Sequence, residues 1–149
     1  MEKSEKMKII RYEEKYRDDL IFMVLEAKNA LGRVPTLNPD MLDVDVFYFS
    51  KGDMFWLALD GNDRVIGSVG CNLLPDGEAV LHRLYVKYTL KRQGIGSALL
   101  ETAENFARDN GRTVMKLHLG EKKTYFESRF FYTKHGYREY ETDYMKKTL

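Results

Sequence analysis

A glycine-containing segment in the second half of the chain is the part of the sequence best suited to chemistry. In order, its residues are Lys91, Arg92, Gln93, Gly94, Ile95, Gly96 and Ser97. An apolar strand pattern precedes it, and a helical pattern follows it. The first N–H groups of a helix have no partner within the helix, and the helix dipole adds positive potential at that end. Because glycines carry no Cβ, a ligand can approach this backbone closely, so the segment predicts an anion-binding turn.

The segment does not match either of the common nucleotide-binding loops. The phosphate loop of nucleotide hydrolases needs Gly-Lys followed by Ser or Thr, whereas this chain has Gly96-Ser97-Ala98. The dinucleotide fingerprint needs a third glycine where Leu99 stands. It also needs a parallel strand, but the preceding strand is the third of three strands joined by short turns, which predicts an antiparallel meander.

The segment resembles the signature of the GCN5-related N-acetyltransferase (GNAT) superfamily. That signature has Arg or Gln, two residues, Gly, any residue, and Gly or Ala at the start of the central helix. This chain has Lys91 at the first position and glycines at 94 and 96. The lysine is a mild departure, because the family uses this turn chiefly through its backbone amides.

A second GNAT signature occurs near the end of the chain. The family carries a tyrosine four residues before Gly-Phe, and this chain has Tyr132, Gly136 and then Tyr137 in place of the phenylalanine. Many members carry Asn seven residues before the tyrosine, where this chain has Tyr125. The two motifs and the order of elements extend the resemblance over nearly the whole chain, which we interpret as one domain of residues 1–149.

The resemblance implies direct transfer of an acetyl group from acetyl-CoA to a primary amine of a small molecule or peptide, without a metal. In the family, the strand before the anion turn splays from its neighbour and turns free N–H groups toward the cofactor. The Val86 amide is therefore the expected donor to the thioester oxygen. The residues expected to bind acetyl-CoA are Leu84, Tyr85, Val86, Lys91, Arg92, Gln93, Gly94, Ile95, Gly96 and Ser97.

Two side chains are expected to move protons. Tyr132 matches the general acid that protonates the leaving thiolate in the family, although it could instead be one more ring in an aromatic helix. His82 has a suitable intrinsic pKa for a base and is expected on the same face of its strand as Leu84 and Val86. A structural histidine, with a chain of waters as the route for the proton, is the alternative.

The family also builds one wall of its acceptor site from the first two helices and their connection, residues 31–53 here. This segment carries Asp40, Asp43 and Asp45 near aromatic residues, which would suit a cationic amine. The alternative is that Asp40 and Asp43 are ordinary acids in the first turn of a helix.

Hydrophobic periodicity predicts the elements that position these residues. Strands are expected at 8–12, 54–59, 64–72, 78–86, 113–119, 137–141 and 143–149. Helices are expected from Asp18 to Gly32, from the N-cap Asn38 to Gly52, from Ile95 to Asn110, and from the capping box at Thr124 to Gly136. The order βαα-βββ-α-β-α-ββ predicts an α/β (α+β) fold with a mixed, mostly antiparallel sheet flanked by helices.

Composition limits the classes of function. The 149 residues are 44% hydrophobic and carry a net charge of +1, so a dedicated nucleic-acid binder is disfavoured. The single Cys71 forms no internal disulfide, the charged first residues do not resemble a secretion signal, and no apolar run would span a bilayer. We therefore expect a cytoplasmic protein without membrane contact, and the resemblance implies a homodimer as one option, because members of the family are often dimers. A non-catalytic CoA-binding sensor or interaction module is the alternative function.

Overall fold

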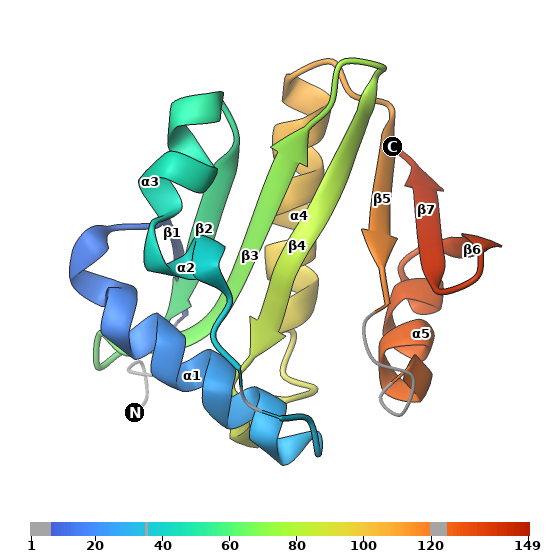
Figure 1. Ribbon diagram of the computed structural model, residues 1–149. Coiled ribbons are helices and arrows are strands. Elements are labelled where there is room, and N and C mark those ends of the chain that lie inside the picture. The colour runs from blue at the N-terminus through green and yellow to red at the C-terminus, as the bar shows by residue number, and fades with distance from the viewer. Residues whose placement is uncertain (1–6, 35, 120–124) are drawn as a thin grey trace.

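The structure is a computed structural model that describes residues 7–34, 36–119 and 125–149. Its strands form one sheet of seven in the order β1-β2-β3-β4-β5-β7-β6 (Figure 1). The strands are β1 (Lys8–Arg11), β2 (Met54–Leu59), β3 (Val65–Leu73), β4 (Glu78–Val86), β5 (Val114–His118), β6 (Arg138–Glu141) and β7 (Tyr144–Thr148). The helices are α1 (Arg17–Ala30), α2 (Pro39–Leu42), α3 (Val44–Phe47), α4 (Ile95–Asp109) and α5 (Tyr125–Lys134). The expected fold class and mostly antiparallel pairing are confirmed.

Helices cover both faces of the sheet, which explains why β2 is apolar throughout. Figure 1 shows α1, α2 and α3 on one face and α4 on the other. Phe55 and Leu57 of β2 pack into the cluster on the α1 face, whereas Trp56 and Ala58 pack into the cluster on the α4 face. A strand covered on both sides reads as a continuous apolar run rather than an alternating one.

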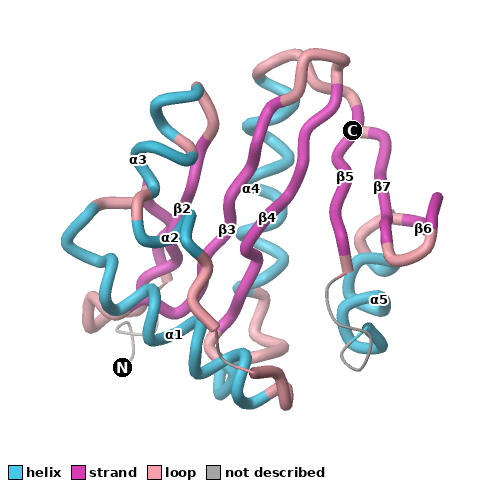
Figure 2. The backbone as a smooth tube through the Cα atoms, viewed as in Figure 1, coloured by secondary structure: helices cyan, strands magenta, loops and turns pink. Residues whose placement is uncertain are grey.

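The pairing of β4 with β5 is short. The two strands run parallel and pair only from Glu78 with Val114 to Val80 with Lys116. β4 continues for six more residues to Val86, and its backbone diverges from β5 toward the start of α4 (Figures 1 and 2). The sheet is therefore open along the later half of β4.

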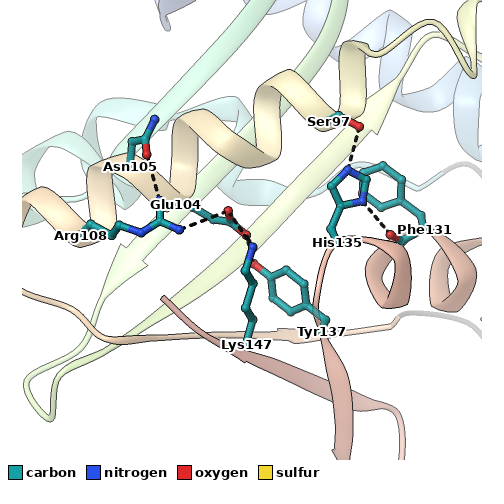
Figure 3. Close-up of polar contacts among 8 residues, drawn as sticks. All are labelled: Ser97, Glu104, Asn105, Arg108, Phe131, His135, Tyr137 and Lys147. Carbon is teal, nitrogen blue, oxygen red and sulfur yellow. Dashed lines mark hydrogen bonds and ion pairs between the residues drawn. The ribbon is translucent and has the colours of Figure 1, made fainter.

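Two polar contacts join α4 to the C-terminal part of the chain beyond this opening (Figure 3). At one end of α4, Ser97 Oγ lies 2.8 Å from His135 Nε2. Further along the helix, the buried Glu104 accepts a hydrogen bond of 2.8 Å from the Tyr137 hydroxyl and one of 3.1 Å from Lys147 Nζ. Each contact satisfies a polar group between packed elements, which reduces the cost of burying it.

The single helix expected after Asn38 is wrong in detail. α2 and α3 are separate because Asp43 leaves the helical conformation, with φ −149° and ψ 72°, and its carboxylate accepts a 3.4 Å bond from the Val46 N–H. A 3₁₀ turn at Phe49–Lys51 follows, and Gly52 ends it at φ 84°. The break shifts the helical phase between the two short helices, and Val46 of α3 is 53% exposed.

Other boundaries differ by small amounts. α1 begins at Arg17, and Gly32 follows its end with φ 79°. Thr124 of the expected capping box lies outside the described residues, and α5 begins at Tyr125, whose side chain is likewise outside what the structure describes. None of the helices in the described part of the chain combines the length and the apolar character needed to cross a bilayer.

Candidate active site

The turn before α4 has the backbone geometry of an anion site. Gly94 is the N-cap of α4 with φ 85°, and Arg92 also has a positive φ of 67°. The Ala98 N–H donates to Gly94 O at 3.0 Å, so the preceding N–H groups lie before the first bond of the helix. A Cβ at Gly94 would meet no protein atom within 4 Å, so the left-handed conformation is what requires glycine there.

Gly96 is in a different environment. A Cβ at this position would lie 3.4 Å from Phe131 Cζ and 3.5 Å from Val86 Cγ2. These are close but ordinary contact distances, so packing against α5 and the end of β4 does not by itself require glycine at this position. The sequence argument assigned both glycines to ligand approach, whereas the structure shows a conformational requirement at Gly94.

The side chains of the turn differ in environment. Arg92 and Gln93 are exposed, whereas Ile95 is buried in the core. Lys91 Nζ forms a 2.9 Å ion pair with Glu127 of α5. Arg92 forms no ion pair with any of the described residues, so its charge, together with the helix dipole, is what the turn offers to a ligand.

A β-bulge interrupts β4 just before the turn. The register with β3 shifts between Ser68 and Gly70, because Gly70 pairs with His82 and Ser68 pairs with Tyr85. Arg83, inside the bulge, has φ 55°, which is unusual for a residue with a side chain. The extra residue reverses the alternation of side chains along the rest of the strand.

This reversal corrects the expected placement of His82. Leu84 and Val86 pack against the α4 cluster, whereas Tyr85 packs against the α1 cluster. His82 lies ahead of the bulge and lines a cavity on the face that carries α2 and α3. His82 is therefore on the opposite face from Leu84 and Val86, because period-two alternation along the strand fails at the bulge.

The backbone after the bulge presents the Val86 amide to the open side of β4. The Lys87 N–H bonds to Ile66 O of the neighbouring segment at 2.9 Å. Since successive N–H groups of a strand point in opposite directions, the Val86 N–H points away from β3. On that side β4 has already lost its pairing with β5. This amide is therefore placed to donate to a ligand in the opening.

Tyr132 lies on α5 among aromatic rings. Its ring is 5.2 Å from that of Phe131 and 5.6 Å from that of Tyr137, both in edge-on arrangements. Burial raises the pKa of the Tyr132 phenol well above its ordinary value, and the nearby Tyr85 adds to the rise. None of the described residues forms a hydrogen bond with its hydroxyl. The phenol thus stays protonated.

A cavity of about 670 Å³ lies between α2–α3 and the sheet. Besides His82, its lining includes Asp40, Tyr48, Asp53 and Arg83. Burial, followed by the positive charge of Arg83, lowers the pKa of His82 below its ordinary value, although Asp40 and Asp53 oppose the shift. His82 is therefore neutral at physiological pH and able to accept a proton.

The acidic residues of the acceptor wall have separate positions. Asp40 lines the cavity, but Arg83 and Tyr48 bond to it, whereas Asp43 and Asp45 are exposed. Although burial alone would raise the pKa of Asp40, hydrogen bonds from Arg83 and Tyr48 lower it below its ordinary value. The sequence argument did not single out Asp53, which is 7% exposed and also lines the cavity.

Asp53 accepts hydrogen bonds from the Leu73 N–H at 2.8 Å and from Asn72 Nδ2 at 2.7 Å. Within the described part of the chain it forms no ion pair. Its buried carboxylate therefore lies at the cavity, whose lining also includes Lys51 and Arg83. No spacing in the sequence marks Asp53 or Arg83 as site residues, because both owe their position to strand pairing.

Known proteins resemble this chain in sequence and in fold. The profile of the acetyltransferase (GNAT) family matches residues 13–137. The chain belongs to the GNAT family. N-acetyltransferase 8 of Homo sapiens is 36% identical over 91 residues, which are 57% of this chain and 40% of that protein. Probable N-acetyltransferase camello of Xenopus tropicalis is 37% identical over 79 residues, 50% of this chain and 35% of that protein. The chain thus spans well under half the length of these curated relatives.

Solved GNAT structures share the fold over almost the entire chain. An acetyltransferase of the family from Staphylococcus aureus Mu50 superposes with a TM-score of 0.86 at 21% identity, covering 97% of this chain and 99% of that one. The PaiA N-acetyltransferase of Thermoplasma acidophilum, crystallised in complex with coenzyme A, gives 0.77 at 20% identity, with coverage of 97% and 99%. At these identities the likeness establishes the fold of the family.

Proposed function

We propose that this GNAT protein transfers the acetyl group of acetyl-CoA directly to a primary amine of a small molecule or peptide. The observation that carries the proposal is the parting of β4 from β5 after Val80, beside the anion-binding turn at the start of α4. The structure from Thermoplasma acidophilum with coenzyme A, and one of a GNAT acetyltransferase from Brucella melitensis with acetyl-CoA, support this choice of donor.

The backbone of the turn and of β4 would hold the donor. The N–H groups of residues 94–97 would bind the diphosphate, with Arg92 adding positive charge. The Val86 N–H would bond to the thioester oxygen, which gains negative charge as the amine attacks. A backbone donor fixed by the sheet needs no reorganisation at that moment, which is what makes it effective.

The cavity beside α2–α3 would receive the amine. The buried carboxylate of Asp53 would attract the ammonium form, and the neutral imidazole of His82 would take one proton from it. The free amine then attacks the carbonyl carbon, so a C–N bond forms and the C–S bond breaks. His82 afterwards releases its proton to solvent.

Tyr132 would give its phenolic proton to the departing sulfur. The second proton lost by the nitrogen returns to Tyr132 through water, so the overall reaction releases a single proton. The raised pKa of Tyr132 keeps the proton in place until negative charge develops on sulfur. The site residues proposed are thus Tyr132 as acid, His82 as base and the Val86 amide as oxyanion donor.

A non-catalytic CoA-binding module is the competing function, favoured by the burial of Tyr132 among aromatic rings. A screen of amine classes with acetyl-CoA separates the two, with free thiol release and the mass of the product as readouts. We expect at least one primary amine to be acetylated. Binding of acetyl-CoA without acetylation of any amine, across small molecules and peptides, would favour the binding module.

A further inference from the structure

The bulge of β4 is held by side chains that belong to the acceptor wall. We propose that Asp40 is a positioning residue that acts through Arg83: the carboxylate on α2 fixes the strained bulge, and the bulge sets which backbone N–H faces the opening between β4 and β5. The proposal rests on the proposed function, since it gives that N–H the role of binding the thioester oxygen.

The strain at the bulge is the first step. Arg83 has φ 55°, a left-handed conformation that is unfavourable for a residue with a side chain. Such conformations persist only where the surroundings determine them, and they gather at functional sites. Arg83 therefore needs contacts that compensate this cost.

Two sets of contacts provide this compensation. The hydroxyl of Ser68, a fully buried residue of β3, donates to the Arg83 carbonyl at 2.8 Å. The Arg83 guanidinium donates to both oxygens of Asp40, with Nη2 to Oδ1 at 3.0 Å and Nε to Oδ2 at 3.0 Å. A planar fork on a carboxylate fixes direction as well as distance. The main chain and the side chain of Arg83 are thus both anchored.

Asp40 itself is fully engaged. Tyr48 donates to Asp40 Oδ2 at 2.7 Å, and Arg83 makes three contacts of 3.0–3.2 Å to the two oxygens. The single Nε–H is shared between the two oxygens, so three donors hold the carboxylate, and the guanidinium charge balances its own. Asp40 is therefore not the group that meets the acceptor ammonium, which the sequence argument had suggested.

The bulge decides the direction of the amides that follow it. Because successive N–H groups alternate, a strand without the extra residue would turn the Val86 N–H toward β3 and the Lys87 N–H toward the opening. The clamp formed by Asp40, Arg83 and Tyr48 therefore controls the oxyanion donor from the other side of the sheet. It also ties the wall of the acceptor cavity to that donor.

The primary test is Asp40→Asn, which removes the charge and one side of the fork. We expect kcat to fall about tenfold, as when a transition-state hydrogen bond is misdirected, with the Kd of acetyl-CoA within about twofold. Asp109→Asn, an exposed change at the C-terminal end of α4, is the matched control and should leave kcat unchanged. A normal kcat in Asp40→Asn overturns the proposal.

A second variant separates positioning from substrate contact and from misfolding. Glycine adopts a positive φ at little cost, so Arg83→Gly in the Asp40→Asn background should keep the bulge without the clamp and restore most of kcat. A rise in the amine KM that Arg83→Gly does not rescue would mean that Asp40 contacts the substrate, and would overturn positioning. Circular dichroism of each variant confirms that the fold is intact.

Hydrogen exchange makes the outcome independent of activity. Amide exchange across residues 82–87 should accelerate in Asp40→Asn and slow again with Arg83→Gly. If no amine is acetylated by the wild type, the proposed function fails while exchange still reports on the clamp. If exchange in this segment is the same in wild type and Asp40→Asn, the clamp does not hold the bulge and the positioning proposal fails.

Discussion

At the residue scale, identical residue types in one motif have different environments. Gly94 and Gly96 stand two positions apart, yet Gly94 is required by its φ of 85°, whereas a Cβ at Gly96 would only touch Phe131 at 3.4 Å. Sequence spacing predicts that glycines occur at this helix start, but it does not distinguish the two environments. The contact at Gly96 comes from α5, which is remote in sequence.

Substituting alanine at each glycine distinguishes the conformational requirement at Gly94 from the contact with Phe131 at Gly96. Gly94→Ala forces a side chain into a left-handed conformation, which costs about 1–2 kcal/mol and should weaken acetyl-CoA binding about tenfold. Gly96→Ala adds a methyl group at ordinary contact distance from Phe131, so its effect should stay within about threefold. Titration of each variant with acetyl-CoA measures the ratio, and a larger loss at Gly96 would contradict the assignment.

The proposed role of Tyr132 can be tested by removing a single oxygen atom. Tyr132→Phe keeps the ring contacts to Phe131 and Tyr137 and deletes the proposed acid, so kcat should fall about a hundredfold. The Kd of acetyl-CoA should hold, because the diphosphate is bound elsewhere. Steady-state rates with the best amine from the screen provide the measurement. Tyr144→Phe on β7 is the control, and equal rates for the two variants would remove Tyr132 from the mechanism.

At the element scale, strands and long helices follow from periodicity, whereas irregular features do not. α4 and the meander β2-β3-β4 lie where the apolar pattern predicts them. The bulge at Arg83 and the break at Asp43 are invisible to a periodic pattern, because each arises from one residue whose side chain finds a partner elsewhere. These two irregularities shape the candidate site. They explain why the place of Arg83 in the cavity lining and the face of His82 were not predicted.

The contact between α4 and α5 is testable as a pair. His135 Nδ1 lies 2.8 Å from the Phe131 carbonyl, so in the neutral ring Nδ1–H donates there and Nε2 accepts from Ser97 Oγ. Ser97→Ala and His135→Ala should each lower the free energy of unfolding by about 1 kcal/mol. The double variant should lose less than the sum, by about 0.5 kcal/mol or more. Urea unfolding measures this coupling, with exposed Thr133→Ala as control, and strict additivity would show that the contact is absent in solution.

At the scale of the whole molecule, element order and composition predict one mixed sheet flanked by helices. The family resemblance adds the parting of β4 from β5, which no residue pattern in either strand indicates. The contacts between α4 and the C-terminal part of the chain cannot be predicted from the sequence, because Glu104, Tyr137 and Lys147 come from three separate segments. Tyr137 stands where the family has Phe, and its hydroxyl is the group that reaches Glu104. The residue that departs from the motif thus forms a hydrogen bond that supports the fold.

The acid stability of the molecule should depend on one such long-range contact. Asp19 at the start of α1 accepts two hydrogen bonds from Arg64 and one of 2.8 Å from the Val65 N–H. Hydrogen bonding from Arg64, opposed by burial and helped by Val65, lowers the pKa of Asp19 below its ordinary value. A lowered pKa means that the native state favours the ionised form. The contact therefore stabilises the fold above the ordinary pKa of about 3.9 and is lost as the pH falls through the lower, folded value.

Asp19→Asn removes this titration. Its melting temperature should be lower than that of the wild type at pH 7, and the difference should shrink as the pH is taken from 5 to 3, because protonation weakens the same contact in the wild type. Asp18→Asn is the matched control, since the neighbouring Asp18 side chain is 90% exposed. Thermal melts across this pH range measure the difference in melting temperature between wild type and variant. Parallel curves for wild type and Asp19→Asn would mean that the anchoring of α1 on the β2–β3 turn does not depend on the charge of Asp19.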